Sequence, residues 1–530
     1  MDPPLRRTLA PVLVIGLILA AAGDAAIRPE APAPGRFVLA LPPPVPPTPV
    51  PPPFQGWSDP ARVGAPYGGT VAGLLTFRGN PTRTYYGSGP VPRTEPVERW
   101  RFPATGGLCS DTVVGTETQH WCGTGWTGQP AVFERDGRTW VVFGAYDAAV
   151  HFLDAATGEP ILPPFQTGDL IKGSVTIDPD GFPLAYVGSR DNNYRVVAFD
   201  REQPVELWRL PATAVSPTLW DDDWDGAGLV IDDYLFIGGE NSVFHIVKLN
   251  RGYDPAGRVT VDPELVFHAP GWDEQVLADF GLTQMAIESS VAIYGDVVYF
   301  ANSGGLVQGW DISGLAAGRE PERVFRFWAG DDIDATVVAD EHGALYVGVE
   351  HERGTARSEQ VGQMLKLDPS RPDDPLVWSV HDRDRRLPSG IWGTPALYQN
   401  LVIFGTNGGD VLGLDRATGT ERWRLQLAGP VWQSPVVVGG VLVIGDCAGE
   451  LHAYDLRPGG APVNLWTFRI GGGCIESTPA IWDGVIYVGT RAGAFHAIGA
   501  GRRTDRRNPA GRGPGSAGPN GAGVGDPTTR

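Results

Sequence analysis

The sharpest chemical motif in this sequence is an acidic run from Asp221 to Gly226. Carboxylates occupy positions 1, 3 and 5 of the run, glycine occupies position 6, and a further carboxylate occupies position 12. Alternate carboxylates in such a loop converge on a hard cation, and the glycine permits the sharp turn. The predicted calcium ligands are Asp221, Asp223, Asp225 and Asp232. Because position 12 is Asp where such loops carry a bidentate Glu, an acidic turn without an ion is the alternative.

Other chemical signals in the sequence are fewer. We find no nucleophile elbow, phosphate-binding loop or zinc motif, so no catalytic residue is predicted. The net charge of −19 disfavours nucleic-acid binding, because phosphate backbones require clustered Lys and Arg. Four cysteines suggest disulfides in an exported chain, and they are Cys109, Cys122, Cys447 and Cys474.

The N-terminus predicts export. Residues 1–26 have the pattern of a signal peptide or an N-terminal membrane anchor, with Arg6 and Arg7 before an apolar stretch. Either interpretation places the remainder outside the cytoplasm, whether secreted, periplasmic or in the cell envelope. Residues 27–66 are predicted to be a Pro-rich linker, and residues 500–530 a disordered tail rich in Gly, Arg and Pro.

Between residues 67 and 499 a unit repeats about eight times, and its strands must position these motifs. Each copy has four short strands, which we name a to d. Strand a follows an anchor residue, and strand d carries Trp after an Asp-x-x-Thr-Gly turn. The anchors are Gln129, Ser174, Ser216, Ser290, Thr336, Thr394, Ser434 and Thr478. The repeat predicts an all-β, eight-bladed β-propeller of four-stranded antiparallel blades.

The last unit lacks its own strand d. It stops near Ile498 without the Thr-Gly turn and Trp, whereas a matching strand lies far upstream at residues 97–102. We therefore expect this N-terminal strand to complete the last blade and to leave no free edge between the first and last blades. The recurrent Trp of strand d and the strand-c histidines are predicted to be scaffold positions. These histidines are His151, His245, His452 and His496.

The repeat resembles that of the pyrroloquinoline-quinone-like, or quinoprotein-type, propellers. The stretch from Gly413 to Trp423 carries the resemblance as Gly-x-Asp-x-x-Thr-Gly-x-x-x-Trp. The segment from Phe77 to Thr84 looks like the segment that precedes the blades in such proteins. Members include quinoprotein alcohol dehydrogenases and the lipoprotein of the outer-membrane-protein assembly machinery. The resemblance covers roughly residues 77–499 and is specific for fold rather than function.

Propeller topology assigns the loops to two faces. The d–a and b–c connections share one face, where the longest loops predict a binding surface. Cys447 and Cys474 fall in adjacent connections of this face, and Cys109 and Cys122 fall in one long d–a connection, so these are the predicted disulfide pairs. The acidic run is expected in an a–b connection of the third unit, on the opposite face, where bound calcium would be structural.

Strand a should line the central channel, and the residues two before each anchor should form a ring near its mouth. By resemblance to quinoproteins, an axial site there holds the quinone and a calcium ion, with a carboxylate pair on calcium and Trp against the flat ring. The predicted cofactor-binding residues are Lys172, Glu288, Asp334, Trp392, Trp432 and Glu476; Thr127 and Ala214 complete the ring. A merely polar channel lining is the alternative, because the chain lacks the vicinal cysteine pair typical of those enzymes.

The sequence thus favours an exported, non-enzymatic binding or assembly scaffold. An unknown protein partner or small ligand would meet its loop-rich face, with no nucleic acid and with membrane contact only through the N-terminal segment. The alternative function is a pyrroloquinoline-quinone-dependent alcohol or sugar dehydrogenase, with the quinone and calcium at the channel mouth.

Overall fold

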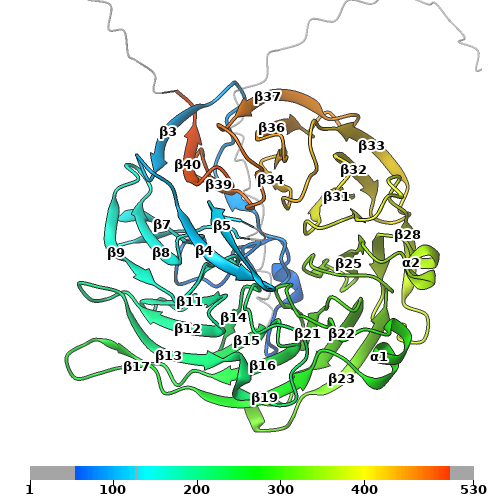
Figure 1. The fold of residues 1–530 in the computed structure, drawn as a ribbon, viewed down its shortest axis with the longest axis horizontal. Coiled ribbons are helices and arrows are strands. Elements are labelled where there is room, and N and C mark those ends of the chain that lie inside the picture. The colour runs from blue at the N-terminus through cyan, green and yellow to red at the C-terminus, as the bar shows by residue number, and fades with distance from the viewer. Residues whose placement is uncertain (1–53, 126–127, 502–530) are drawn as a thin grey trace, which may run out of the picture. The chain divides into compact units, whose positions relative to one another are not determined.

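Eight small antiparallel sheets form a ring in the computed structural model of this chain (Figure 1). The structure describes residues 54–125 and 128–501, so the predicted signal or anchor, most of the linker and nearly all of the tail lie outside the described residues. The predicted eight-bladed β-propeller is confirmed. Within these ranges, none of the helices has the length and apolar character that crossing a bilayer requires.

The first four blades follow one another along the chain. Blade one contains β6 (Ala131–Arg135), β7 (Arg138–Ala145), β8 (Ala149–Asp154) and β9 (Pro160–Gln166), with β1 (Gly73–Leu74) beside β6. Blade two contains β10 (Thr176–Ile177), β11 (Leu184–Ser189), β12 (Asn193–Ala198) and β13 (Val205–Pro211). Blade three contains β14 (Leu229–Ile231), β15 (Tyr234–Gly238), β16 (Val243–Lys248) and β19 (Glu264–Pro270). Blade four contains β20 (Ala292–Tyr294), β21 (Val297–Phe300), β22 (Leu306–Asp311) and β23 (Glu322–Trp328).

The last four blades continue the ring. Blade five contains β24 (Val338–Ala339), β25 (Leu345–Gly348), β27 (Met364–Leu367) and β28 (Leu376–Val380). Blade six contains β30 (Ala396–Tyr398), β31 (Leu401–Gly405), β32 (Asp410–Asp415) and β33 (Glu421–Gln426). Blade seven contains β34 (Val436–Val438), β35 (Val441–Gly445), β36 (Glu450–Asp455) and β37 (Val463–Arg469). Blade eight contains β38 (Ala480–Trp482), β39 (Val485–Thr490) and β40 (Ala494–Gly499), with β2 (Gly87–Ser88) and β3 (Val97–Phe102) on its two sides.

Smaller elements decorate the connections. Three strand pairs lie outside the blades: β4 (Cys109–Val114) with β5 (Glu117–Cys122), β17 (Gly252–Tyr253) with β18 (Val259–Thr260), and β26 (Glu350–His351) with β29 (Ser389–Gly390). Two short helices are α1 (Glu274–Phe280) and α2 (Ala356–Val361). Three 3-10 turns are η1 (Pro60–Arg62), η2 (Ala212–Ala214) and η3 (Leu315–Ala317).

The burial of each strand follows its place in the blade. Strand β35, with the sequence Val-Leu-Val-Ile-Gly, is buried along its whole length because neighbouring blades cover both faces of its sheet. Strand β33, at the outer edge, alternates charged and apolar residues and is half exposed. Strands inside the ring are therefore continuous apolar runs, whereas strands at its outer edge contain both charged and apolar residues.

Two of the strand-d tryptophans connect neighbouring blades. The indole N–H groups of Trp100 and Trp378 donate to backbone carbonyls in the c–d turns of the next blades, at 2.9 and 3.1 Å. Those turns contain Gly158 and Gly419, whose φ angles of 75° and 71° favour glycine. A Cβ on either glycine would lie 2.7 or 2.8 Å from the facing indole. The Thr-Gly of the repeat therefore serves both the turn and the tryptophan of the preceding blade.

An N-terminal strand closes the ring, as predicted. Strand β3 pairs antiparallel with β40, so Phe102 lies opposite Phe495 and Val97 lies opposite Gly499. Strand β2 pairs parallel with β38 on the inner side of the same blade. Blade eight therefore combines strands from the N-terminal and C-terminal ends of the described chain. Its strand c, β40, is paired with β3, which serves as the missing strand d.

Residues 72–90, which we call the lead-in segment, fill the channel below its mouth. In Figure 1 this segment is drawn in blue and crosses the middle of the ring. Its carbonyl groups accept hydrogen bonds from strand a or its edge in blades two, four and five; the donors are the N–H groups of Ile177, Ile293 and Ala339. The mouth is therefore the open end of a cavity rather than of a through-pore.

Two arginines of the lead-in segment are completely buried. Arg83 donates to the carbonyl oxygens of Val291 at 2.8 Å and Ala227 at 3.1 Å, in two different blades. Arg78 donates to the carbonyl oxygens of Pro395 and Pro435, in two further blades. Burial is the main cause that lowers the pKa of both guanidinium groups, to about 9 for Arg83. Arg83 thus joins blades three and four, and Arg78 joins blades six and seven, each through a segment that precedes all the blades in the sequence.

Both predicted disulfides are present. Cys109 is bonded to Cys122, and Cys447 is bonded to Cys474. The first joins the two ends of the β4–β5 hairpin, and the second joins the b–c turn of blade seven to the d–a connection that enters blade eight. Disulfides persist in oxidising compartments, so this pairing fits an extracytoplasmic location.

Candidate functional site

A belt of hydrogen bonds around the channel fixes the ring of residues at its mouth. The backbone N–H of one anchor donates to the hydroxyl of the next anchor in blades three to six, at 2.9 to 3.0 Å. The same bond joins Gln129 to Ser174 at 2.8 Å. Since five of the anchors are held in this way to the next one, the residues two positions earlier are brought to one level of the channel.

The belt corrects the sequence alignment of blade three. The residue that donates to Ser290 is Ala227, not Ser216, and strand a of this blade begins at Leu229. Sequence analysis chose Ser216 because Ala227 lacks the hydroxyl that marks most anchors. The ring position of blade three therefore belongs to Asp225, whereas Ala214 ends the turn η2.

The same correction moves the acidic run to the other face. Residues 221–226 lie between β13 and β14, which is a d–a connection, and not in the expected a–b connection. They consequently share a face with the long loops and with the channel mouth, which we call the mouth face. The ring of the mouth and the acidic run, predicted as two separate sites, therefore meet at Asp225.

A cavity of about 280 Å³ opens at the mouth. Five of the predicted cofactor-binding residues line it: Lys172, Glu288, Asp334, Trp432 and Glu476. The sixth, Trp392, stacks on Trp432 with ring centres 4.7 Å apart and planes 18° apart. The cavity is also lined by Trp121, Tyr146 and Arg491. The remaining ring residue, Thr127, lies outside the described residues.

Lys172 lies between two buried carboxylates. Its Nζ is 2.5 Å from Oδ2 of Asp225 and 3.3 Å from Oε1 of Glu240, and these two residues are 1% and 4% exposed. Burial alone would lower the pKa of Lys172, but the two carboxylates outweigh it and raise the pKa above its ordinary value. Lys172 is therefore a charged group already committed to Asp225 and Glu240.

The facing side of the ring is acidic. Burial, followed by the carboxylate of Asp334, raises the pKa of Glu288 well above its ordinary value. The pKa of Asp334 is also raised well above its ordinary value, mainly by burial and next by the carboxylate of Asp332. Ser303 donates to Glu288 at 3.3 Å. These carboxyl groups hold protons more strongly than exposed ones, because the mouth offers their negative charge little compensation.

The third side of the cavity is aromatic and cationic. The guanidinium of Arg491 lies over the rings of Tyr146 and Trp121, at 4.8 and 5.2 Å, and contacts the Glu476 carboxylate at 3.1 Å. Trp121 is placed by the β4–β5 hairpin, which extends toward the centre of the ring in Figure 1. The disulfide between Cys109 and Cys122 closes this hairpin, so it also positions Trp121 at the mouth.

The predicted calcium ligands are only partly brought together. Asp223 contacts Arg190 at 2.8 Å, and burial is the main cause that raises its pKa to about 7. Among the described residues, two groups of carboxylates place their oxygens within 4.8 Å of one another. One group contains Asp221, Asp223 and Glu240, and the other contains Asp225, Glu240 and Glu288. Asp232 is in neither group; it is exposed in the β14–β15 turn, with a φ of 47°. Calcium binding by the acidic run remains a prediction.

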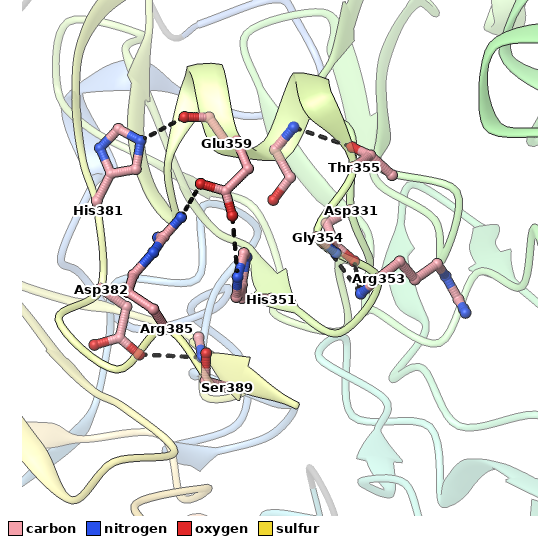
Figure 2. Close-up of polar contacts among 12 residues, drawn as sticks. Asp331, His351, Arg353, Gly354, Thr355, Glu359, His381, Asp382, Arg385 and Ser389 are labelled. Carbon is pink, nitrogen blue, oxygen red and sulfur yellow. Dashed lines mark hydrogen bonds and ion pairs between the residues drawn. The ribbon is translucent and has the colours of Figure 1, made fainter. Parts of the chain in front are cut away.

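An insertion in blade five builds the adjoining wall of the mouth face (Figure 2). The carboxylate of Asp331, which is fully buried, accepts the backbone N–H of Gly354 at 2.9 Å and so fixes the loop before α2. From α2, Glu359 contacts Arg385 and lies 3.3 Å from Nε2 of His351, in β26. These contacts hold β26, whose other residue, Glu350, is buried beside the acidic side of the ring.

Sequence reasoning missed part of the cavity. Trp121, Tyr146 and Arg491 come from a hairpin and from two b–c turns, and Glu240 comes from a third. Tyr146, Glu240 and Arg491 each lie two residues after the glycine near the end of strand b, but the residue type at this position changes from blade to blade. The repeat therefore marks these positions without indicating that they line the cavity. The ring residues themselves recur at a fixed distance from the anchors and could be found.

Comparisons with known proteins agree with the repeat. Residues 331–507 match the family described as outer membrane protein assembly factor BamB. A curated relative, the outer membrane protein assembly factor BamB of Xanthomonas campestris pv. campestris, is 28% identical over 147 residues, which are 24% of this chain and 35% of the relative. The chain thus spans about a third of the length of that relative. The resemblance to quinoprotein-type repeats is confirmed for this part of the chain.

Solved structures give the fold alone. BamB from Moraxella catarrhalis has a TM-score of 0.47 at 15% identity, over 70% of this chain and 94% of that one. Quinohemoprotein alcohol dehydrogenase from Comamonas testosteroni has a TM-score of 0.50 at 12% identity, over 81% of this chain and 80% of that one. The latter likeness extends the propeller resemblance beyond the C-terminal blades.

Proposed function

We propose that this protein is a non-enzymatic binding or assembly scaffold of the cell envelope that engages its partner at the mouth face. The observation that carries the proposal is the acidic mouth cavity, in which the two lining cations are already paired with carboxylates. The two disulfides support the location. The relative named as an outer membrane protein assembly factor supports a protein partner for this chain as well.

The chemistry of the cavity argues against a quinone. Pyrroloquinoline quinone is a flat tricarboxylate, so a protein that binds it must supply positive charge. Lys172 faces Asp225 and Glu240, and Arg491 faces Glu476. An anionic cofactor would instead meet Glu288 and Asp334, whose burial is already unfavourable. The residues present do not fit this cofactor.

Exposed apolar side chains on the mouth face support a protein partner. They are Val113, Trp220, Leu282 and Leu387, with exposures of 45 to 58%, and each belongs to a different d–a connection. Apolar side chains around a polar centre are typical of protein interaction surfaces. The opposite arrangement, a uniformly charged rim, would favour a small soluble ligand.

A dehydrogenase is the second candidate, because Asp225, Glu240 and Glu288 place ligand atoms within 4.8 Å of one another and could hold calcium if the Lys172 ammonium moved aside. The test is to add pyrroloquinoline quinone and calcium to the purified chain and follow its absorption spectrum and dye-linked oxidation of alcohols and sugars. We expect neither a spectral change nor oxidation. Stoichiometric quinone binding with turnover would replace the scaffold function with the enzyme.

The scaffold function is tested by site-specific photo-crosslinking in the cell envelope. Crosslinkers placed at Leu282 and Leu387, on the mouth face, should give one discrete adduct. Matched controls at Val205 and Val463, which are similarly exposed at the starts of strands d, should not. Equal adducts from both sets of positions would contradict a partner at the mouth face.

A further inference from the structure

The mouth contains more acidic than basic side chains. Eight carboxylates gather there: Asp223, Asp225, Glu240, Glu288, Asp332, Asp334, Glu350 and Glu476. Four cations face them: Lys172, Arg190, Arg353 and Arg491. Within residues 54–125 and 128–501, Glu288, Asp334 and Glu350 have no Lys, Arg or His within ion-pairing distance. The three carboxylates without a cation lie side by side in blades four and five.

Some of these carboxylate oxygens also lack hydrogen bonds. In the described part of the chain, the carboxyl groups of Asp334 and Glu350 contact each other, but Oε1 of Glu350, Oδ1 of Asp334 and Oδ1 of Asp225 are buried and accept no hydrogen bond from any other group. Glu350 is 3% exposed and Asp225 is 1% exposed. A buried acceptor left unpaired costs roughly 1–3 kcal/mol, and more when it is charged. A bound cation would supply both the missing hydrogen-bond donors and the missing charge.

The shape of the cavity indicates what kind of cation fits. A volume of about 280 Å³ exceeds what one metal ion needs and is at the lower end of the size of small-molecule pockets. Trp121, Tyr146 and Trp432 line one side, and aromatic faces attract organic cations. Lys172 already occupies the space between Asp225 and Glu240 where a metal ion would lie. The cavity therefore suits an ammonium or guanidinium group with an apolar stem.

We propose that the mouth cavity binds a lysine or arginine side chain of the partner polypeptide, with Glu288 and Asp334 as its acceptors. This inference rests on the proposed scaffold function and names what anchors the partner. The partner segment would carry its basic residue between apolar residues, because Leu282, Leu387 and Trp220 are exposed in d–a connections of the mouth face. The long side chain would reach down between the aromatic wall and the acidic wall.

The test uses the full chain and two short peptides, one with lysine between leucines and one in which norleucine replaces the lysine. Calorimetry should show at least tenfold tighter binding of the lysine peptide, because only its ammonium can pair with the carboxylates. Glu288→Gln and Asp334→Asn should each weaken that binding tenfold or more. Asp136→Asn, in an exposed turn of the opposite face, is the matched control and should change nothing.

A pH series provides a second measurement that needs no variant. Because the mouth carboxyl groups have raised pKa values, they are protonated at low pH and the lysine peptide should bind more weakly at pH 5 than at pH 8. Equal binding of the two peptides, or binding that Glu288→Gln and Asp334→Asn leave intact, would overturn the inference. Calcium binding at these residues without discrimination between the peptides would overturn it as well.

The two proposals fail in different ways. If adducts still form at Leu282 and Leu387 but the lysine and norleucine peptides bind equally well, only the proposed binding of a basic side chain in the cavity is wrong. If the lysine peptide binds at the cavity but adducts show no preference for the mouth face, the scaffold function is wrong and the cavity is a site for small cations.

Discussion

His245 shows how one repeat position can carry different chemistry in different blades. The equivalent histidines of blades one, seven and eight lie 3.0 to 3.5 Å from a carboxylate. His245 is instead fully buried against Trp224, with ring centres 5.3 Å apart. Burial lowers its pKa to about 3, so it is neutral in the folded protein. The sequence indicated a scaffold role for all four positions, but not that His245 would pack against Trp224 where the others meet a carboxylate.

At the residue scale we predict that His245 makes the fold sensitive to acid. Unfolded His binds a proton below about pH 6.5, whereas folded His245 does not until about pH 3, so stability falls as the pH drops through this window. The loss approaches about 1.4 kcal/mol per pH unit. In chemical denaturation between pH 7 and pH 4, His245→Phe should show a shallower decline than the parent chain. His342→Phe, at an exposed histidine, is the control, and an unchanged slope for His245→Phe would contradict the prediction.

The candidate site could be predicted only where it follows the repeat. Lys172, Glu288 and Asp334 lie at a fixed distance from anchors with hydroxyl groups, so their convergence follows from topology. Asp225 was found as a possible calcium ligand but not as a ring residue, because its anchor, Ala227, has no hydroxyl. Glu240 lies two residues after the strand-b glycine Gly238, a position that recurs, but its residue type varies between blades and so gave no sign that it would meet Lys172.

Among the elements, the connections on the mouth face determine what the ring can bind. The β4–β5 hairpin carries Trp121 to the cavity, and the blade-five insertion carries Glu350 there. The positions of the strands were predictable, because each strand and turn is encoded by a short local pattern: an apolar run or an Asp-x-x-Thr-Gly turn. The pairing of β26 with β29 was not, because each strand has only two residues and its register depends on the loop around it.

At this scale we predict that the disulfide between Cys447 and Cys474 stabilises the junction of blades seven and eight. Removing it with the double substitution Cys447→Ser and Cys474→Ser should lower the free energy of unfolding by about 2–4 kcal/mol, because the unfolded chain regains loop entropy. The change is measured by chemical denaturation under non-reducing conditions.

The matched control is the double substitution Cys109→Ser and Cys122→Ser. This disulfide closes a shorter loop within one paired hairpin, 13 residues against 27, so a smaller loss of stability is expected. It should instead weaken binding at the cavity, because Trp121 loses its support. If the variant without Cys109 and Cys122 lost more stability than the variant without Cys447 and Cys474, the junction of blades seven and eight would not depend on its disulfide.

At the scale of the whole molecule, the lead-in segment bonds to several blades at once. Arg83 bonds to Ala227 and Val291, and Arg78 bonds to Pro395 and Pro435, so four blades share two side chains. The sequence indicated that residues 77–84 precede the blades, but not that they fill the channel. Repeats otherwise contact only their neighbours, and a long-range connector of this kind is invisible to a periodic pattern.

We accordingly predict that Arg83→Met destabilises the entire ring. Three buried carbonyl groups would lose their donor, which costs about 3 kcal/mol or more, since each unpaired group costs roughly 1–3 kcal/mol. The thermal transitions followed by far-UV and near-UV circular dichroism should shift together to lower temperature. Arg386→Met, at an exposed arginine, should leave them unchanged. Separate transitions for the two signals would show that the blades unfold independently of the lead-in segment.

The closing strand also sets an order of events in time. During synthesis β3 emerges long before β40, since Val97 pairs with Gly499, roughly 400 residues later, and such distant pairing is slow to form. Until then the backbone groups of β3 have no partner, and an unpaired strand is a template for another chain. We therefore expect the nascent chain to be vulnerable to aggregation in the interval before its last strand is made.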